Sequence, residues 1–294
     1  MKTWRDFPIQ IITEQDTNWP KSLSSISKPV KKLYYRGKWD EKIFAKTLAI
    51  VGSRRSTRYG AEVVDKFIPV MVSNKIAIIS GFMYGVDTLA HKKCLELGGK
   101  TVAVLGSGLD VCYPSENDKL YSEILESGGL VISEFEPKFQ ATLWSFPARN
   151  RIVAALSSLG VLVVEAGIKS GSMITARLAV EMGKEVYAVP GSIFSPTSKG
   201  CNYLLSNGAQ IATCAEDILN LPSTETEEGR LTLFESLNEQ ELKIAKILER
   251  EPFSMDLLYK ETGLTAGHLA STLSLMSLKG VVEEVGGMFR LVQK

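Results

Sequence analysis

The sequence FPARNRIVAALSSLGVLVVEAGIKSGSMITA, residues 146–176, holds the pattern on which the fold prediction depends. It begins with a basic tripeptide, Arg149-Asn150-Arg151, that opens an apolar helical run. A short apolar run of the buried-strand type follows, and a second helix is expected to begin near Ser172. Helix, buried strand and helix in this order indicate one unit of a parallel α/β sheet.

The loop between that strand and the second helix has the composition of an anion site. It contains Lys169, Ser170, Gly171 and Ser172 beside the expected helix N-terminus. Free backbone N–H groups and the positive end of the helix dipole attract anions at such a place. Ser172 is expected to cap the helix, because the GxSxG pattern of a serine nucleophile is absent. The unit therefore predicts phosphate binding without an obvious nucleophile.

Seven apolar runs of this kind alternate with helical patterns along the chain. They are Thr47–Gly52, Lys75–Gly81, Thr101–Gly108, Leu130–Glu134, Gly160–Gly167, Glu185–Gly191 and Ala209–Thr213. The alternation predicts a doubly wound, mostly parallel sheet with helices on both faces. Because open α/β sheets bind ligands at the carboxyl ends of their strands, the loops after these runs are the expected site. Besides the residues already named, those loops hold Ser53, Arg54, Arg55, Gly81 and Lys199.

Changes in composition divide the chain into four parts. Residues 1–45 are expected to form a short N-terminal arm with one short strand, and residues 46–221 form the α/β domain. The polar, acidic stretch 222–230 is a linker. Residues 231–294 show three helical patterns and a hairpin pattern, which together predict a winged helix-turn-helix domain.

The winged domain lacks the cations that duplex binding requires. Its expected recognition helix, about Thr265–Lys279, has one Lys and one His, whereas phosphate contacts dominate the affinity of proteins for DNA. Leu269, Leu273 and Met276 recur at helical spacing and are expected to form an exposed apolar face. A role in protein contact or packing is therefore favoured over major-groove recognition.

The overall composition is that of an ordinary globular protein. Residues 221–294 carry eight Lys/Arg and twelve Asp/Glu, a net charge of −4, so the chain total of +1 leaves +5 for residues 1–220. An excess of this size does not by itself require a polyanionic partner. Four scattered cysteines without a CxxC pair favour reduced thiols in a cytoplasmic protein. Neither a transmembrane run nor a signal-peptide pattern is present in the sequence.

The strongest functional signal is the Arg149-Asn150-Arg151 segment. Its cations are expected at a helix N-terminus, where they oppose the helix dipole. An anionic ligand is favoured over a plain intramolecular ion pair as the group that offsets that cost. The two histidines, His91 and His268, have neither metal-ligand nor catalytic spacing, so no metal or cofactor is expected. Both are expected to be surface or capping residues.

Seven motifs together resemble those of the DNA-processing protein A (DprA, also Smf) family. They are AIVGSRRSTRYG (49–60), SGFMYGVDTLAH (80–91), VAVLGSGLDVCYP (102–114), SEFEP (133–137), FPARNRI (146–152), EAGIKSGSMITA (165–176) and VPGSIFSPTSKGCNYLL (189–205). The resemblance runs in order over about residues 46–219 and is highly specific as a set.

The resemblance implies an extended Rossmann-like core that binds single-stranded DNA. It also implies a homodimer without enzymatic activity that loads RecA recombinase onto incoming strands in natural transformation. No membrane partner is expected. Carried onto the matching positions, the expected nucleic-acid contacts are Ser53, Arg54, Arg55, Gly81, Arg149, Asn150, Arg151, Lys169, Ser170, Gly171, Ser172 and Lys199.

Two other functions remain open from the residues. The phosphate-type loops and Glu165 at a strand end also suit a Rossmann-like nucleotide-processing enzyme of the phosphoribohydrolase type, although the PGGxGT loop of that group is missing. The third hypothesis is a structural adaptor that works through the winged domain.

Overall fold

The computed structural model describes residues 2–24, 26–219, 237–279 and 281–292. The described residues form two compact units on either side of residues 220–236. The predicted linker, 222–230, lies outside the described residues.

Within the described residues, nine strands form one sheet in the order β1-β2-β6-β5-β4-β3-β7-β8-β9. The strands are β1 (Gln10–Thr13), β2 (Lys32–Gly37), β3 (Thr47–Val51), β4 (Ala77–Ser80), β5 (Thr101–Val104), β6 (Leu130–Ser133), β7 (Val161–Val163), β8 (Val186–Ala188) and β9 (Gln210–Ile211). Strands β3 to β9 are parallel, whereas β2 pairs antiparallel with both β1 and β6. The predicted α/β class and its mostly parallel sheet are confirmed.

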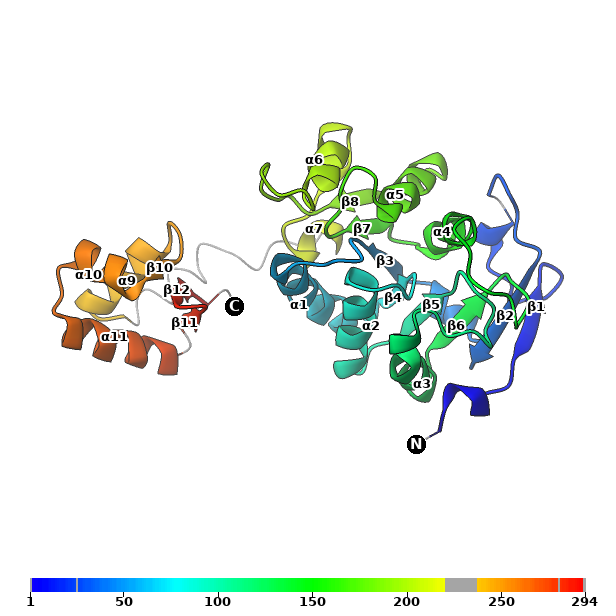
Figure 1. Ribbon diagram of the computed structural model, residues 1–294, viewed down its shortest axis with the longest axis horizontal. Helices are drawn as coiled ribbons and strands as arrows, with labels where there is room; N and C mark the ends of the chain where they lie inside the picture. The colour runs from blue at the N-terminus through cyan, green and yellow to red at the C-terminus, as the bar shows by residue number, and fades with distance from the viewer. Residues whose placement is uncertain (1, 25, 220–236, 280, 293–294) are drawn as a thin grey trace. The chain divides into compact units, whose positions relative to one another are not determined.

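Helices cover both faces of this sheet (Figure 1). They are α1 (Arg58–Ser73), α2 (Val86–Glu96), α3 (Asp118–Glu126), α4 (Ser145–Leu156), α5 (Gly171–Glu181), α6 (Lys199–Ser206) and α7 (Ala215–Leu219). Figure 1 shows α1, α2 and α3 on one face and α4 and α5 on the other. Leu48 and Ile50 of β3 belong to the core shared with α1, while Ala49 and Val51 belong to the core shared with α4. Burial on both faces explains why the strand is continuously apolar.

The segment before Lys46 is part of the sheet and contains two strands, where the sequence indicated one. Arg36 of β2 is buried, donates to the carbonyl of Trp4 at 3.0 Å and pairs with Asp110 at 2.6 Å. The Trp4 ring stacks on Tyr121 of α3 with a centroid separation of 4.8 Å. These contacts tie the N-terminal segment to the first unit.

The second unit has the predicted winged helix-turn-helix fold. Its elements are α9 (Glu239–Leu248), β10 (Phe253–Ser254), α10 (Met255–Thr262), α11 (Ala266–Leu278), β11 (Val282–Val285) and β12 (Met288–Leu291). The last two strands form a hairpin at Gly286 and Gly287, whose φ angles of 63° and 78° suit a two-residue turn. Asn238 caps α9 in a capping box with Glu241.

The apolar stripe of α11 is buried, so the expected exposed face is wrong. Leu269, Leu273 and Met276 pack in the core of the second unit with residues of α9 and the hairpin. Helical spacing predicts that a stripe is covered but does not show whether its own domain or a partner covers it. Lys279, just after α11, pairs with the buried carboxylate of Glu241 at 2.6 Å.

His91 on α2 is fully buried, so its expected surface or capping position is wrong. Its Nδ1 lies 2.7 Å from Oγ1 of Thr101, and that hydroxyl donates to the carbonyl of Ile78 at 2.8 Å. Thr101 must therefore accept from the ring, which makes Nδ1 the protonated nitrogen. Burial, with a smaller contribution from Arg149, lowers the pKa of His91 to about 3.

We expect His91 to destabilise the fold as the pH falls below about 6.5. The unfolded chain takes up a proton there and the folded chain does not, so the free energy of unfolding falls by up to about 1.4 kcal/mol per pH unit. Urea unfolding between about pH 6.5 and pH 5 measures this slope before most carboxylates titrate. His91→Gln should flatten it, and His268→Gln, at an exposed position, should not. An equal slope in wild type and His91→Gln would contradict a buried neutral imidazole.

Candidate nucleic-acid interface

The strand order places a topological switch between β3 and β7. The chain runs from β3 through β4 and β5 to β6 on one side, and α4 then leads back to β7 on the other side of β3. Open α/β sheets bind ligands in the crevice outside the carboxyl ends of their strands at such a point. The loops after β3 and β7 therefore flank the expected site, and the loops after β4, β5, β6 and β8 extend it along the same edge.

Glu165, which follows β7, holds the N-terminus of α1 in place. Its carboxylate is buried and accepts hydrogen bonds from the N–H of Thr57 at 2.8 Å, the hydroxyl of Thr57 at 2.6 Å and the hydroxyl of Thr197 at 3.1 Å. A Cβ on Gly60 would lie 2.2 Å from the carboxylate, so glycine is needed for this approach. Both carboxylate oxygens are engaged by protein donors, so Glu165 acts as a structural cap at the N-terminus of α1.

Arg54 and Arg55 are exposed on a braced turn after β3. The hydroxyl of Ser53 accepts from the N–H of Arg55 at 3.1 Å, and the carbonyl of Ser53 accepts from the first N–H of α2 at 3.2 Å. Gly85, with φ of 74°, permits that contact, because a Cβ there would lie 2.2 Å from the Ser53 carbonyl oxygen. The guanidinium of Arg54 lies 5.1 Å from the centre of the Phe146 ring, within cation–π range.

Arg149 is an internal anchor of the sheet edge, with only 3% of its surface exposed. The helix α4 begins at Ser145, a turn earlier than expected, because Pro147 fits a first turn in which N–H groups have no helical partner. Arg149 consequently lies in the second turn. Its guanidinium donates to the carbonyl oxygens of Gly81 and Val104, at the ends of β4 and β5. The expected phosphate contact from Arg149 does not fit this burial.

Asp87 on α2 supplies the opposite charge beside Arg149. Burial raises the pKa of Asp87, while Arg149 and a hydrogen bond from the N–H of Met83 oppose that shift. Burial likewise lowers the pKa of Arg149 to about 10, and the negative charge of Asp87 opposes that shift. A Cβ on Gly81 would lie 2.6 Å from both Nη2 of Arg149 and Oδ2 of Asp87. Gly81 is thus needed to admit this buried pair.

Arg151 and Asn150 also make contacts within the protein. Arg151 donates to both carboxylate oxygens of Glu134, which follows β6, at 2.6 and 2.5 Å, and its side chain is mostly buried. Asn150 donates to the carbonyl of Gly171 at 3.2 Å and so links α4 to α5. The tripeptide with the strongest sequence signal therefore joins the loops that follow β4, β5, β6 and β7.

The loop after β7 keeps its expected helix cap, but two residues earlier. Ser170 is the N-cap of α5 and accepts from the N–H of Ser172 at 3.4 Å, while the two hydroxyls lie 2.8 Å apart. Ser172 itself is buried. Lys169 is exposed, and so is Lys199, which begins α6 where a loop was expected.

The predicted contacts thus separate into internal anchors and exposed cations. Arg54, Arg55, Lys169 and Lys199 are exposed after β3, β7 and β8, which are neighbouring strands. Neighbouring strands lie about 4.8 Å apart, so the loops that carry these side chains share one part of the edge. These four residues are the cationic half of the candidate interface.

Exposed aromatic side chains follow the strands on the other side of β3. Tyr84 follows β4 and donates to Glu116 at 2.7 Å, Tyr113 follows β5 with its ring 5.6 Å from that of Phe146, and Trp144 follows β6. Tyr84, Tyr113 and Trp144 are the aromatic half of the interface. The set of expected contacts did not include them, although aromatic residues in loops that follow apolar, strand-like runs are a signal visible in the sequence.

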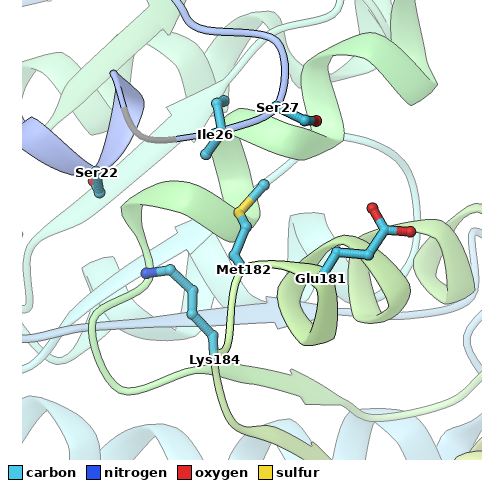
Figure 2. A pocket seen from close by; sticks show the side chains of 6 residues that line it. All are labelled: Ser22, Ile26, Ser27, Glu181, Met182 and Lys184. Atoms are coloured by element: carbon cyan, nitrogen blue, oxygen red, sulfur yellow. The ribbon is translucent and has the colours of Figure 1, made fainter.

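A hollow of about 150 Å³ lies elsewhere on the first unit (Figure 2). Its lining residues are Ser22, Ile26, Ser27, Glu181, Met182 and Lys184. Lys184 precedes β8, which places the hollow at the amino ends of the parallel strands. Figure 2 shows Met182 pointing towards Ile26, and the ammonium group of Lys184 donates to the carbonyl of Ser157 at 2.6 Å. The hollow is separate from the candidate interface.

Metal-ligand clusters and membrane-spanning helices are both absent from the described residues. No group of three or more His, Cys, Asp or Glu side chains there could hold a metal ion. No helix among them has both the length and the apolar character needed to cross a membrane.

Two family models match this chain. The model described as DNA recombination-mediator protein A matches residues 10–222, and the model described as DprA winged helix domain matches residues 234–288. The chain belongs to the DNA recombination-mediator protein A family. The family resemblance inferred from the seven motifs is therefore confirmed, and the second match agrees with the fold of the second unit.

Individual relatives support the same assignment. DNA processing protein DprA of Streptococcus pneumoniae is 43% identical over 218 residues, which are 74% of this chain and 75% of the relative. Protein Smf of a Synechocystis strain is 32% identical over an alignment that covers 95% of this chain and 79% of the relative.

Two solved structures of the family resemble the first unit in fold and sequence. The X-ray structure of DNA processing protein A from Streptococcus pneumoniae has a TM-score of 0.67 and 40% identity, and covers 74% of this chain and 75% of that one. DNA processing protein A from Helicobacter pylori, described for its single-stranded DNA binding mode, has a TM-score of 0.64 and 34% identity, and covers 73% of this chain and 95% of that one.

We expect Arg149→Ala to lower the free energy of unfolding by about 3–5 kcal/mol, because it leaves the Asp87 charge and two strand-end carbonyls buried without their partner. Arg54→Ala, at an exposed position of the same edge, should change it by less than about 0.5 kcal/mol. Urea unfolding followed by circular dichroism measures both. Equal stabilities of the two variants would show that Arg149 does not anchor the edge.

Proposed function

We propose that the protein is a single-stranded-DNA-binding recombination mediator. The observation that carries the proposal is the division of one sheet edge into a cationic half, which contains the switch point, and an aromatic half, which adjoins it between β3 and β4. Cations neutralise phosphates and aromatic faces stack on unpaired bases, and proteins that bind single strands combine the two. In a duplex the base faces are covered by neighbouring bases, which leaves the aromatic half without a partner. Membership of the family, and the single-strand binding described for the Helicobacter pylori relative, support the same choice.

The width of the edge sets the length of DNA that fills it. Five strand spacings separate β6 from β8, and at about 4.8 Å each they span about 24 Å. At the 3.4 Å spacing of phosphates along one strand of B-form DNA, this is about seven phosphates. An oligonucleotide of roughly that length or longer is the proposed ligand.

Binding without catalysis is the function that the side chains of this edge support. Glu165 and Asp87 are buried and occupied by protein donors or a protein cation. Neither of these two carboxylates is therefore free to act as the base that the phosphoribohydrolase alternative requires.

We first predict the effect of removing two cations from the cationic half. In fluorescence anisotropy with labelled oligo-dT, Arg54→Ala with Arg55→Ala should weaken binding and reduce the slope of log K against log salt by about 1.4, which is about 0.7 for each phosphate that is no longer neutralised. Lys46→Ala is the matched control, because Lys46 is exposed at the opposite end of the same strand β3. An unchanged slope in the double variant would remove this edge as the binding site, and a preference of the wild type for duplex would contradict the proposed function.

The proposal extends to loading RecA recombinase onto single strands that enter the cell in natural transformation, which places the protein in the cytoplasm. The recombination-mediator description of the family supports this step. The readout is RecA-dependent ATP hydrolysis on DNA already coated with single-strand-binding protein. Wild type should shorten the lag before hydrolysis, and Arg54→Ala with Arg55→Ala should not. Equal lags with and without the wild-type protein would refute the loading role while leaving DNA binding intact.

The proposal also includes a homodimer formed through β9, the last strand of the sheet order. Both residues of β9 are exposed, and the preceding helix α6 exposes Tyr203. An open edge strand presents unpaired backbone N–H and C=O groups to a second chain, and an exposed apolar side chain adds contact area.

We expect Ile211→Lys to convert the dimer to a monomer without loss of thermal stability. Ile11→Lys is the matched control, because Ile11 lies on the opposite edge strand β1 and is 55% exposed, against 56% for Ile211. Light scattering coupled to size-exclusion chromatography gives the mass of each variant. A dimeric Ile211→Lys variant would show that the chains associate elsewhere.

A further inference from the structure

An aromatic cluster lies in the loop between β6 and α4. The rings of Phe135 and Phe139 stack with centroids 4.5 Å apart and an interplanar angle of 15°. Trp144 meets both rings edge-on, at 5.6 Å and 5.7 Å. We name Phe135, Phe139 and Trp144 the aromatic platform. Two phenyl rings thus support the indole from within its own loop.

The indole of Trp144 is the exposed member of the platform. It is 59% exposed, and the neighbouring Leu143 is 92% exposed. The backbone under it is braced, because the N–H of Thr142 donates to the hydroxyl of Ser145 at 3.0 Å and the N–H of Ser145 donates to the carbonyl of Thr142 at 3.1 Å. A single exposed apolar side chain is ordinary on a protein surface. An indole that is both exposed and held by two rings and a closed turn loses little freedom when it binds a flat partner.

The platform belongs to the candidate interface. Its loop is joined to the loop after β5 by hydrogen bonds from the N–H of Gly108 to the carbonyl of Phe139 at 2.9 Å and from the N–H of Asp110 to the carbonyl of Pro137 at 2.8 Å. Tyr113 lies on that neighbouring loop. The platform therefore marks the β6 end of the edge, beyond Tyr113 and Phe146.

We propose that the aromatic platform is a base-stacking subsite at the β6 end of the interface, in which the indole of Trp144 takes the face of one unpaired base. The inference rests on the proposed single-strand binding. It adds Trp144 as a residue that sets how far along the sheet edge the DNA strand is held. A nucleobase is favoured as the occupant for two reasons. The exposed side chain of Lys138 lies in the same loop and suits a phosphate next to the stacked base. The platform also continues the row of aromatic side chains that follows β4 and β5.

The first test is equilibrium binding of a labelled oligo-dT of about 20 nucleotides to the full chain. Stacking contributions measured by alanine substitution at other single-strand sites correspond to about 5- to 140-fold in affinity. Trp144→Ala should weaken binding by a factor in that range, and Trp144→Phe by less, because a phenyl ring still stacks. The salt slope should stay at the wild-type value, since every cation that neutralises a phosphate is still present. Tyr259→Ala, at an exposed aromatic residue of the second unit, is the matched control and should bind as wild type.

The second test uses DNA with a single abasic site moved along the oligonucleotide. Wild type should lose affinity when the abasic site falls at the stacked position, and Trp144→Ala should not distinguish that oligonucleotide from the intact one. Tryptophan fluorescence gives an independent readout, because Trp4 and Trp19 are buried, Trp39 is partly covered, and Trp144 is the most exposed of the four indoles. DNA should quench wild-type fluorescence more strongly than that of Trp144→Phe.

The outcomes separate this inference from the proposed function. If wild type and Trp144→Ala bind oligo-dT equally and respond equally to abasic sites, the subsite is refuted while single-strand binding stands. Trp144→Ala could instead bind oligo-dT more weakly while its affinity falls at each abasic site as that of wild type does, or it could melt at a lower temperature. Either result would mean that the platform only supports its loop. If wild type binds no single strand, both proposals fail.

Discussion

The buried guanidinium of Arg149 is the interaction on which the carboxyl edge of the sheet depends. Parallel strands end with carbonyl groups that need donors, and Arg149 supplies them at the ends of two neighbouring strands. The charge is tolerated because Asp87 lies close by, and the pair fits because Gly81 has no Cβ. Such a buried pair adds little net stability by itself, but losing either member leaves an uncompensated charge. The edge is therefore held in one arrangement, and exposed side chains can be positioned on it.

The position of Arg149 also shows a limit of prediction from the sequence. The helix-dipole argument correctly identifies an arginine that needs compensation, but it assigns that compensation to a ligand. The acceptors are the carbonyls of Gly81 and Val104, which lie 68 and 45 residues away in the chain. These carbonyls lie beside Arg149 because of the order of the strands in the sheet. A local sequence pattern does not reveal that order. The same limit applies to His91, whose partner Thr101 comes from the next strand.

The parts of the fold that could be predicted are those set by local chemistry. Continuous apolar runs identify β3 to β8, because a strand buried on both faces has no polar side. The run around β9 was recognised in the same way, although both residues of that edge strand are exposed. Paired glycines identify the hairpin of the second unit. The antiparallel strand β1 was missed because its residues include exposed side chains and show no continuous apolar run. The stripe Leu269, Leu273 and Met276 was recognised as a stripe, but periodicity does not identify what covers it.

In the proposed interface, the two halves would bind DNA through forces that respond differently to salt. Four exposed cations, each neutralising one phosphate, give a salt slope of about −2.8 and thus about a 600-fold loss of affinity for a tenfold rise in salt. A cationic half of this size binds weakly at physiological ionic strength if it acts alone. Stacking on aromatic faces involves no counterion release, so salt does not weaken it in the same way. The modest positive charge of residues 1–220 does not by itself require a polyanionic partner. It is compatible with the proposed single-strand binding, in which the aromatic half would supply the salt-independent part of the affinity.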